Sequence, residues 1–387
     1  MRPGLEWRNR LDSVDDAETG SGTRRRRSFR SVAAAVIGLV TILPSGVTRG
    51  AGADMDPELR KQARRAVDAG LHYLRGTQAE DGSWSASVGV TAIALRAYLE
   101  SHRGYSEVDG AFITRPLAFI LQHVNEDGSI GETNQNRSYS SAVALVALQA
   151  TGNPKYTPQI VNAQKFLAGI QIDEAEGYEP DHAYYGGIGY GGDERPDLSN
   201  QYIAIEALQA TSFDPENAVW EKAKVFLSRC QNRSESNDQE WAANDGGFAY
   251  MPGYSPHGGT VSYGGMTHAG LISLLFAGID KQDPRVRSAH EWILANYTLD
   301  ENPGAKDKSG LYYYYTVFAK SMAAYDEDVL TATDGERHVW REEFTRKMLS
   351  LQGSDGSWVN PDSPRWMEGN KDLTTARIVI SLNLATH

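Results

Sequence analysis

One unit recurs six times along the chain, and this repetition limits the fold more than any other feature. Each copy has an apolar segment ending in Leu-x-x-x-Gln or a similar string, a turn with Asp-Gly or Gly-Gly near an aromatic residue, and a segment rich in Ala and Leu. The turn glycines are Gly82, Gly128, Gly187, Gly247, Gly310 and Gly356. A unit of this size cannot bury its apolar face alone, so neighbouring units must stack.

The segments after the turns predict helices that are enclosed on several sides. Residues 141–148 and 203–208 are Ala or apolar at nearly every position, whereas segments before the turns, such as 222–226, carry charges on one face. No segment alternates with a period of two over a useful length, as a β fold requires. We predict an all-α (α/α)6 toroid of six helical hairpins, with the second helices inside and Thr91, Ser140 and Thr374 as helix caps.

Residues 1–53 predict a polar extension followed by an export signal. A basic cluster at residues 24–27 precedes an apolar run at 32–43, and Ala51-Gly52-Ala53 has the small residues of a cleavage site. About a dozen apolar residues span only about half of a bilayer core as a helix, so a retained membrane anchor is the weaker alternative. We expect cleavage after Ala53, a periplasmic or extracellular location, no permanent membrane span in the mature chain, and a single toroid domain at residues 54–387.

Charge and cysteine content narrow the choice of partners. The formal net charge is −12, and the expected signal segment carries more Arg than acidic residues, so the mature chain is more acidic still. Nucleic-acid binding needs a basic surface, and we expect no such partner. The single cysteine, Cys230, excludes an intramolecular disulfide, so stability must come from packing.

The repeated Gln, Asp-Gly-Ser and Trp positions resemble the QW motif of the terpene cyclase and protein prenyltransferase superfamily. The resemblance covers about residues 58–387 and implies the same toroid, in which the motif's Gln and Trp tie each outer helix to the turn leading inward. It places the motif at Gln78 with Trp84 and at Gln352 with Trp358, and the Gln alone at Gln122, Gln171 and Gln231. The motif is structural, so it implies a fold without implying an activity.

In that superfamily the chemistry lies mostly at the amino-terminal ends of the inner helices. Enzymes resembling squalene-hopene cyclase have an Asp-x-Asp-Asp acid there, but here Asp197-Leu198-Ser199-Asn200 matches only the first Asp. The zinc set of the protein prenyltransferases is also absent, because Cys230 lies in an outer helix. We expect no metal and no cofactor, although a zinc set drawn from Asp197, His268 or Asp372 stays open.

Two insertions, residues 178–197 and 254–268, are rich in Gly and Tyr, and each precedes an inner helix. Both are therefore expected at one mouth of the ring, where tyrosines form an apolar wall that also makes hydrogen bonds. Alternatively, these loops only close the mouth. The candidate ligand-binding residues are His182, Tyr184, Tyr185, Tyr190, Tyr263, His268, Tyr313 and Trp366, and the candidate acids are Asp197 and Glu368.

Three hypotheses for function follow. The leading one is an exported squalene-cyclase-like protein whose central cavity binds an isoprenoid-like, glycosyl-like or other extended apolar ligand, with catalysis open. The second is an active isoprenoid cyclase or transferase that uses a non-standard acid at Asp197 or Glu368. The third is a non-catalytic structural or protein-binding toroid, since helical repeats also present surfaces to proteins.

Overall fold

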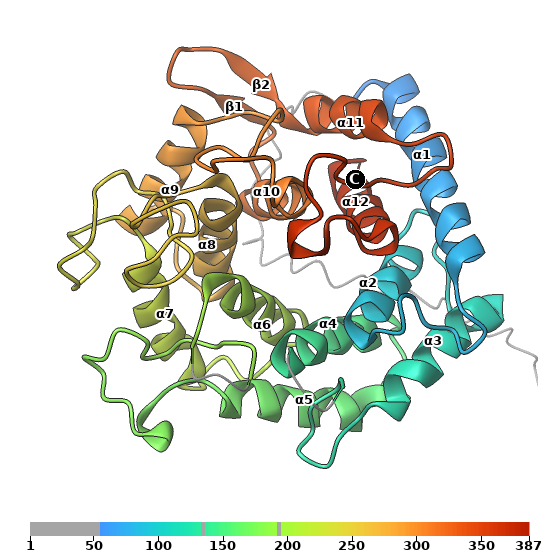
Figure 1. Ribbon diagram of the computed structural model, residues 1–387, viewed down its shortest axis with the longest axis horizontal. Coiled ribbons are helices and arrows are strands. Elements are labelled where there is room, and N and C mark those ends of the chain that lie inside the picture. The colour runs from blue at the N-terminus through green and yellow to red at the C-terminus, as the bar shows by residue number, and fades with distance from the viewer. Residues whose placement is uncertain (1–54, 133–135, 192–194, 387) are drawn as a thin grey trace, which may run out of the picture. The chain divides into compact units, whose positions relative to one another are not determined.

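The computed structural model describes residues 55–132, 136–191 and 195–386, so the expected export signal lies outside the described residues. The described part holds twelve α-helices that alternate between an outer and an inner ring (Figure 1). The outer helices are α1 (Pro57–Thr77), α3 (Ala111–Gln122), α5 (Thr157–Gly169), α7 (Val219–Cys230), α9 (Pro284–Ala295) and α11 (Trp340–Leu351). The inner helices are α2 (Val88–Leu99), α4 (Arg137–Ala150), α6 (Leu198–Ala210), α8 (Gly264–Phe276), α10 (Leu311–Tyr325) and α12 (Lys371–Thr386). The predicted (α/α)6 toroid is confirmed.

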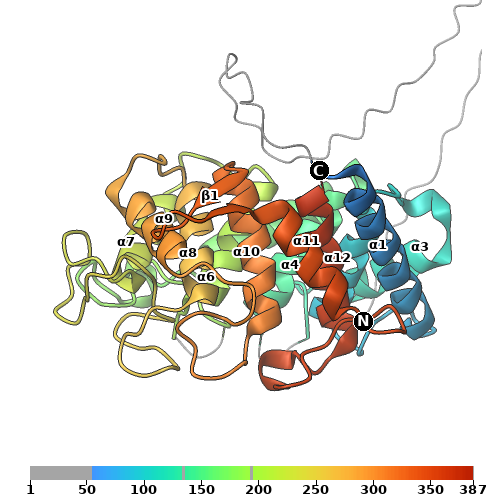
Figure 2. The same cartoon turned by 90° about the horizontal axis from the view of Figure 1, so that it is seen from above.

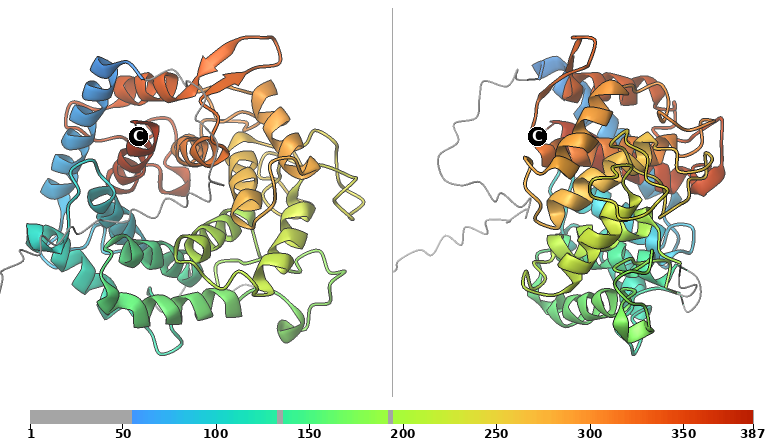
Figure 3. Two further views of the ribbon diagram at one scale, coloured as in Figure 1. Left: turned by 180° about the vertical axis from the view of Figure 1, so that it is seen from behind. Right: turned by 90° about the vertical axis from the view of Figure 1, so that its left-hand side faces the viewer.

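The inner ring closes on itself. Each inner helix packs against the next one along the chain, and α12 packs against α2 (Figures 1 and 3). All residues at 88–98 in α2 and at 264–274 in α8 are buried, as expected for helices covered on every side. A short antiparallel pair, β1 (Val329–Thr331) and β2 (Arg337–Val339), connects α10 to α11.

Because every inner helix follows an outer helix through a turn, all inner helices begin at the same end of the ring. We call this end the entry mouth, defined by the cap residues Ser87, Asn136, Asp197, Tyr263 and Gly310. The opposite end, where the inner helices finish, is the far mouth. Long connections gather on one side of the ring in Figure 2, and the two Gly and Tyr-rich insertions are among those leading into the entry mouth.

Glutamine side chains join neighbouring outer helices. Each lies at or just beyond the end of its outer helix and donates both to the carbonyl of a turn glycine and to a carbonyl in the next outer helix, at 2.8–3.1 Å. The pairs of acceptors are Gly82 and Phe112 for Gln78, Gly186 and Val219 for Gln171, Gly246 and Arg285 for Gln231, and Gly356 and Ala66 for Gln352. The last pair closes the outer ring between α11 and α1.

Two expectations about these turns were wrong. Gln122 makes no such bonds in the described part of the chain, and in this turn the Asn125 amide donates instead, to the Ser129 hydroxyl at 3.0 Å and the Gly131 carbonyl at 3.1 Å. Thr91, Ser140 and Thr374 lie inside their helices and do not cap them. Ser87 caps α2, and the Thr91 hydroxyl instead accepts from the Trp84 N–H at 3.0 Å. The same bond recurs from Ile130 to Ser141, Ile188 to Gln201, Phe248 to Thr267 and Trp358 to Thr375.

Candidate functional site

A cleft of about 500 Å³ opens at the entry mouth. Its lining joins three segments that are far apart in the sequence: the first insertion, the loop at residues 250–256, and the loop before α12. The lining residues are Tyr184, Arg195, Tyr250, Met251, Pro252, Gly253, Tyr254, Pro256, Arg365 and Trp366. Two of the candidate ligand-binding residues, Tyr184 and Trp366, therefore line the same cleft. A ligand site at the entry mouth requires such a shared lining.

Trp366 stands out in this cleft by its exposure and its backbone. Its side chain is 40% exposed, and the guanidinium of Arg365 lies 4.5 Å from the centre of its ring. Trp366 and Met367 have φ values of 55° and 63°, in the left-handed region that non-glycine residues avoid. Such strain costs on the order of 1–3 kcal/mol per residue and clusters at ligand sites. An exposed indole held in this way is suited to contact a ligand.

Asp197 lies beneath the cleft and caps α6. The carboxylate is 2% exposed and accepts from the backbone N–H groups of Ser199 at 2.9 Å and Asn200 at 3.0 Å. It also accepts from the Asn200 amide at 2.6 Å. Burial raises the pKa of Asp197, while Ser199, Asn200 and Tyr250 act in the opposite direction. The carboxylate is therefore engaged in capping the amino-terminal end of α6.

Tyrosines surround this carboxylate. Burial raises the pKa of Tyr190 and Tyr250, and the nearby charge of Asp197 raises both further. Asp197 also contributes to the raised pKa values of Tyr263 and Tyr313, after burial. The phenols therefore stay neutral hydrogen-bond donors. Tyr250 both lines the cleft and lies beside Asp197, so the floor of the cleft adjoins the Asp197 carboxylate and the tyrosines around it.

Glu368 caps a second inner helix. It is fully buried, accepts from the Tyr313 N–H at 2.7 Å through one oxygen, and accepts from the Asn360 amide at 2.7 Å through the other. Burial raises the pKa of Glu368. At α2 and α8 the N–H groups of Val88 and Gly265 are bound by Glu132 and Asn302. These helix ends, where the superfamily's chemistry was expected, are thus occupied by the chain's own side chains.

The remaining candidate residues are spread over several environments. His182 is exposed and its ring contacts Tyr178 and Tyr184, whereas Tyr185 is buried and donates to Glu174 at 2.8 Å. Tyr263 is buried against the ring of His257, with 4.6 Å between centres. The structure therefore brings Tyr184, Tyr190, Tyr263, Tyr313 and Trp366 to the entry mouth or just inside it, and leaves the Tyr185 hydroxyl bound to Glu174 near α7.

His268 of α8 lies in the core against α10, and its burial should make the folded protein less stable in acid. Its Nδ1 is 2.6 Å from the Ser321 hydroxyl, and burial lowers its pKa from 6.5 to about 3. Between these two pH values the unfolded chain binds a proton that the folded chain excludes, so stability falls as pH falls. His268→Gln should reduce the slope of unfolding free energy against pH by up to about 1.4 kcal/mol per unit. Urea unfolding between pH 7 and pH 4 measures this slope, and His182→Gln at an exposed site is the control that should leave the slope unchanged. Equal slopes for the wild type, His268→Gln and His182→Gln would disprove the role of His268.

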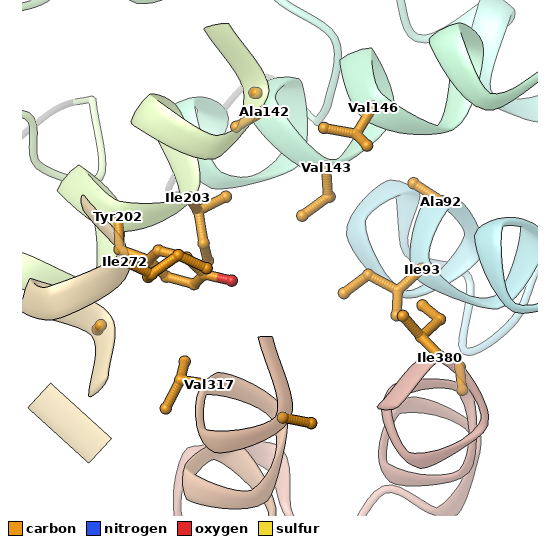
Figure 4. Packing of buried hydrophobic residues seen from close by; sticks show 14 of the residues in the cluster. Ala92, Ile93, Ala142, Val143, Val146, Tyr202, Ile203, Ile272, Val317 and Ile380 are labelled. Carbon is orange, nitrogen blue, oxygen red and sulfur yellow. The ribbon is translucent and has the colours of Figure 1, made fainter. Parts of the chain in front are cut away.

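Apolar side chains from the inner helices point toward one another around the ring axis (Figure 4). They are Ile93 of α2, Val143 of α4, Ile203 of α6, Val317 of α10 and Ile380 of α12, all 8% exposed or less. We call these five residues the apolar belt. They occupy the middle of the inner helices, between the entry mouth and the far mouth.

Three charged side chains meet across the ring one helical turn beyond the belt. Lys320 Nζ lies 2.6 and 2.8 Å from the two carboxylate oxygens of Glu206, and Arg96 lies 3.4 Å from the same carboxylate. We call Arg96, Glu206 and Lys320 the charged triad. Each stands three residues after a belt residue of its helix, so the triad lies on the far-mouth side. Sequence reasoning missed it, although isolated charges in otherwise apolar helices were the available signal.

Other site types find no support in the described residues. No group of three or more His, Cys, Asp or Glu within them is arranged to hold a metal ion, so Asp197, His268 and Asp372 do not form the zinc set that the sequence left open. No helix in the described ranges combines the length and apolar character needed to cross a bilayer.

Comparison with solved structures places the chain among helical toroids with the terpene cyclase fold, while no family model matches the sequence. The type II terpene cyclase MstE from Scytonema, in complex with geranylgeranyl dihydroxybenzoate, is 14% identical with a TM-score of 0.52, covering 85% of this chain and 98% of that one. Cellobiose 2-epimerase from Spirochaeta thermophila DSM 6192 is 13% identical with a TM-score of 0.54, covering 85% and 98%. A protein from Actinoplanes is 14% identical with a TM-score of 0.51, covering 84% and 100%. One fold thus carries a cyclase and an epimerase, and the likeness establishes the fold alone.

Proposed function

We propose that this chain is an exported protein that binds an extended, isoprenoid-like apolar ligand within its ring. The observation that carries the proposal is the apolar belt, contributed by α2, α4, α6, α10 and α12, lying beneath an aromatic cleft at the entry mouth. A ligand that passes the cleft meets aromatic faces first and aliphatic side chains next, and the charged triad stops it at the far mouth. Burial of apolar surface is the main driving force for such binding.

The ligand complex of MstE supports the isoprenoid class, because a toroid of the same fold holds a geranylgeranyl compound. Catalysis is not part of the proposal. Burial raises the pKa of both Asp197 and Glu368. Both nevertheless serve as helix caps, and both oxygens of each carboxyl group are already bound by N–H donors of the chain itself.

A second candidate ligand class is a sugar. Exposed Trp366 and Tyr254 line the same cleft, and the Arg365 guanidinium lies against the Trp366 ring. Together they offer flat apolar faces and hydrogen-bond donors, and cellobiose 2-epimerase shares the fold. The belt favours the isoprenoid class, since a sugar hydroxyl placed among Ile93, Val143 and Ile203 would lose its hydrogen bonds to water.

Titration of the purified protein with farnesol, squalene and cellobiose, followed by tryptophan fluorescence, tests the proposal. Farnesol and squalene should bind, and Trp366→Gly should weaken the binding of both by about fivefold or more, because the indole face is removed while glycine accepts the positive φ.

The intact mass of the same sample tests export, since cleavage after Ala53 starts the chain at residue 54.

Val108→Ser is the matched control, because Val108 is the most exposed large apolar residue in the described ranges, at 93%, and lies in the connection from α2 to α3 at the far mouth. It should leave both affinities unchanged. Binding of cellobiose with no binding of either prenyl compound would replace the isoprenoid proposal with the sugar one.

A further inference from the structure

Arg377, on α12, is a buried guanidinium without a carboxylate beside it. It is 9% exposed, and its one hydrogen bond within the described residues runs from Nη2 to the Tyr139 hydroxyl at 3.0 Å. The other buried arginines are paired. Arg96 binds Glu100 at 2.7 Å, and Arg229 binds Asp238 at 2.6–2.8 Å together with the backbone carbonyls of Pro180 and His182.

The surroundings of Arg377 face the ring interior. Its guanidinium lies 5.7 Å from the centre of the Tyr313 ring, and the Tyr313 hydroxyl is buried without a hydrogen-bond partner among the described residues. Arg377 stands three residues before Ile380 on α12, while Tyr139 and Tyr313 stand four residues before Val143 and Val317. Residues at these spacings share a helix face. Arg377, Tyr139 and Tyr313 therefore form a polar collar between the entry mouth and the apolar belt.

The collar carries a positive charge that the protein leaves largely uncompensated. Burial alone lowers the pKa of Arg377, but Tyr139 and then Glu368 raise it above its usual value, so the guanidinium stays charged. Glu368 is not within ion-pair distance, and its oxygens are already bound by Tyr313 N–H and Asn360. Taking a cation out of water without a counter-charge costs stability, and an anion bound beside Arg377 would offset that cost.

We propose that the polar collar binds one anionic group of the ligand, a carboxylate or a phosphate, with Arg377 donating N–H bonds and the Tyr139 and Tyr313 hydroxyls completing the contact. The inference rests on the proposed isoprenoid-binding function and gives the ligand a polarity: the anionic head lies toward the entry mouth and the apolar tail lies on the belt. A guanidinium offers a planar pair of donors that matches either anion.

Calorimetric titration with farnesol, farnesoic acid and farnesyl monophosphate tests the charge, because the three share one tail. At least one of the two anions should bind about tenfold or more tightly than farnesol, and which one does identifies the head group. Arg377→Met should abolish that preference and leave farnesol affinity unchanged. Tyr313→Phe keeps the ring and should weaken the anions several-fold without affecting farnesol.

The outcomes separate the two proposals. If farnesol and both anions bind equally to the wild-type protein, the anion site is refuted and the isoprenoid proposal stands. If none of the three binds, the isoprenoid proposal fails first. Stability gives an independent check, because Arg377→Met should keep or raise the melting temperature, whereas Arg229→Met should lower it by breaking a paired cation. A melting temperature lowered equally by both would mark Arg377 as a structural residue and overturn the inference.

Discussion

Glu206→Gln is expected to lower the free energy of unfolding by about 3–5 kcal/mol, the usual cost of removing one partner from a buried ion pair. Glu206 is the only carboxylate that Lys320 contacts in the described residues, and it also faces Arg96 at 3.4 Å. Nearby Lys320 and Arg96 outweigh burial and lower the pKa of Glu206 to about 2, so it is ionised at neutral pH. A neutral amide leaves the buried Lys320 ammonium without a carboxylate contact, close to Arg96, which keeps only its bond to Glu100. Urea unfolding at pH 7 measures the loss.

Two further variants identify the cause. Glu58→Gln removes a carboxylate from the exposed pair with Arg65, 3.1 Å apart, and should not change stability measurably. Replacing the whole triad, as Arg96→Met with Glu206→Leu and Lys320→Met, should recover most of the loss, since buried ion clusters replaced by apolar residues are often neutral or stabilising. A triple variant as unstable as Glu206→Gln alone would show that the triad charges are not responsible.

The ring was predictable because its signal repeats in register. Six copies of a turn with glycine, each between an apolar segment and an Ala-rich one, fix where helices end and which of them are enclosed. Local hydrogen bonds were harder to predict. Ser87 directly precedes α2 and Thr91 lies in its first turns. Which of them caps the helix depends on where the backbone turns after Trp84.

The site was only partly predictable, and the reason differs from residue to residue. Asp197 is followed by Ser199 and Asn200, so its capping role was readable from local sequence as easily as an acid role. Glu368 binds a backbone N–H 55 residues away, which no local pattern reveals. Arg377 is the only charged residue in residues 373–386 of α12, and its environment is set by Tyr139 and Tyr313 on two other helices.

Gly186→Ala is expected to cost about 3 kcal/mol or more, because two penalties combine at this turn. Gly186 has a φ of 81°, which costs an alanine about 1–2 kcal/mol. An added Cβ would also lie 1.9 Å from the Lys222 carbonyl oxygen in α7, well inside contact distance. The turn cannot move away, since the Gly186 N–H donates to Ile172 at 2.7 Å and its carbonyl accepts from Gln171 at 2.9 Å. Chemical denaturation measures the loss.

Gly177→Ala separates the two penalties. Gly177 lies just before the first insertion and has a φ of 83°, but no atom lies within 4 Å of an added Cβ, so this variant should lose only the backbone part, about 1–2 kcal/mol. The difference between the two variants then measures how tightly the third turn packs on the next outer helix. Equal losses would mean that Gly186 packs only loosely on Lys222 of α7. The Gln171 bonds to Gly186 and Val219, together with helix packing, would then hold the ring closed at α7.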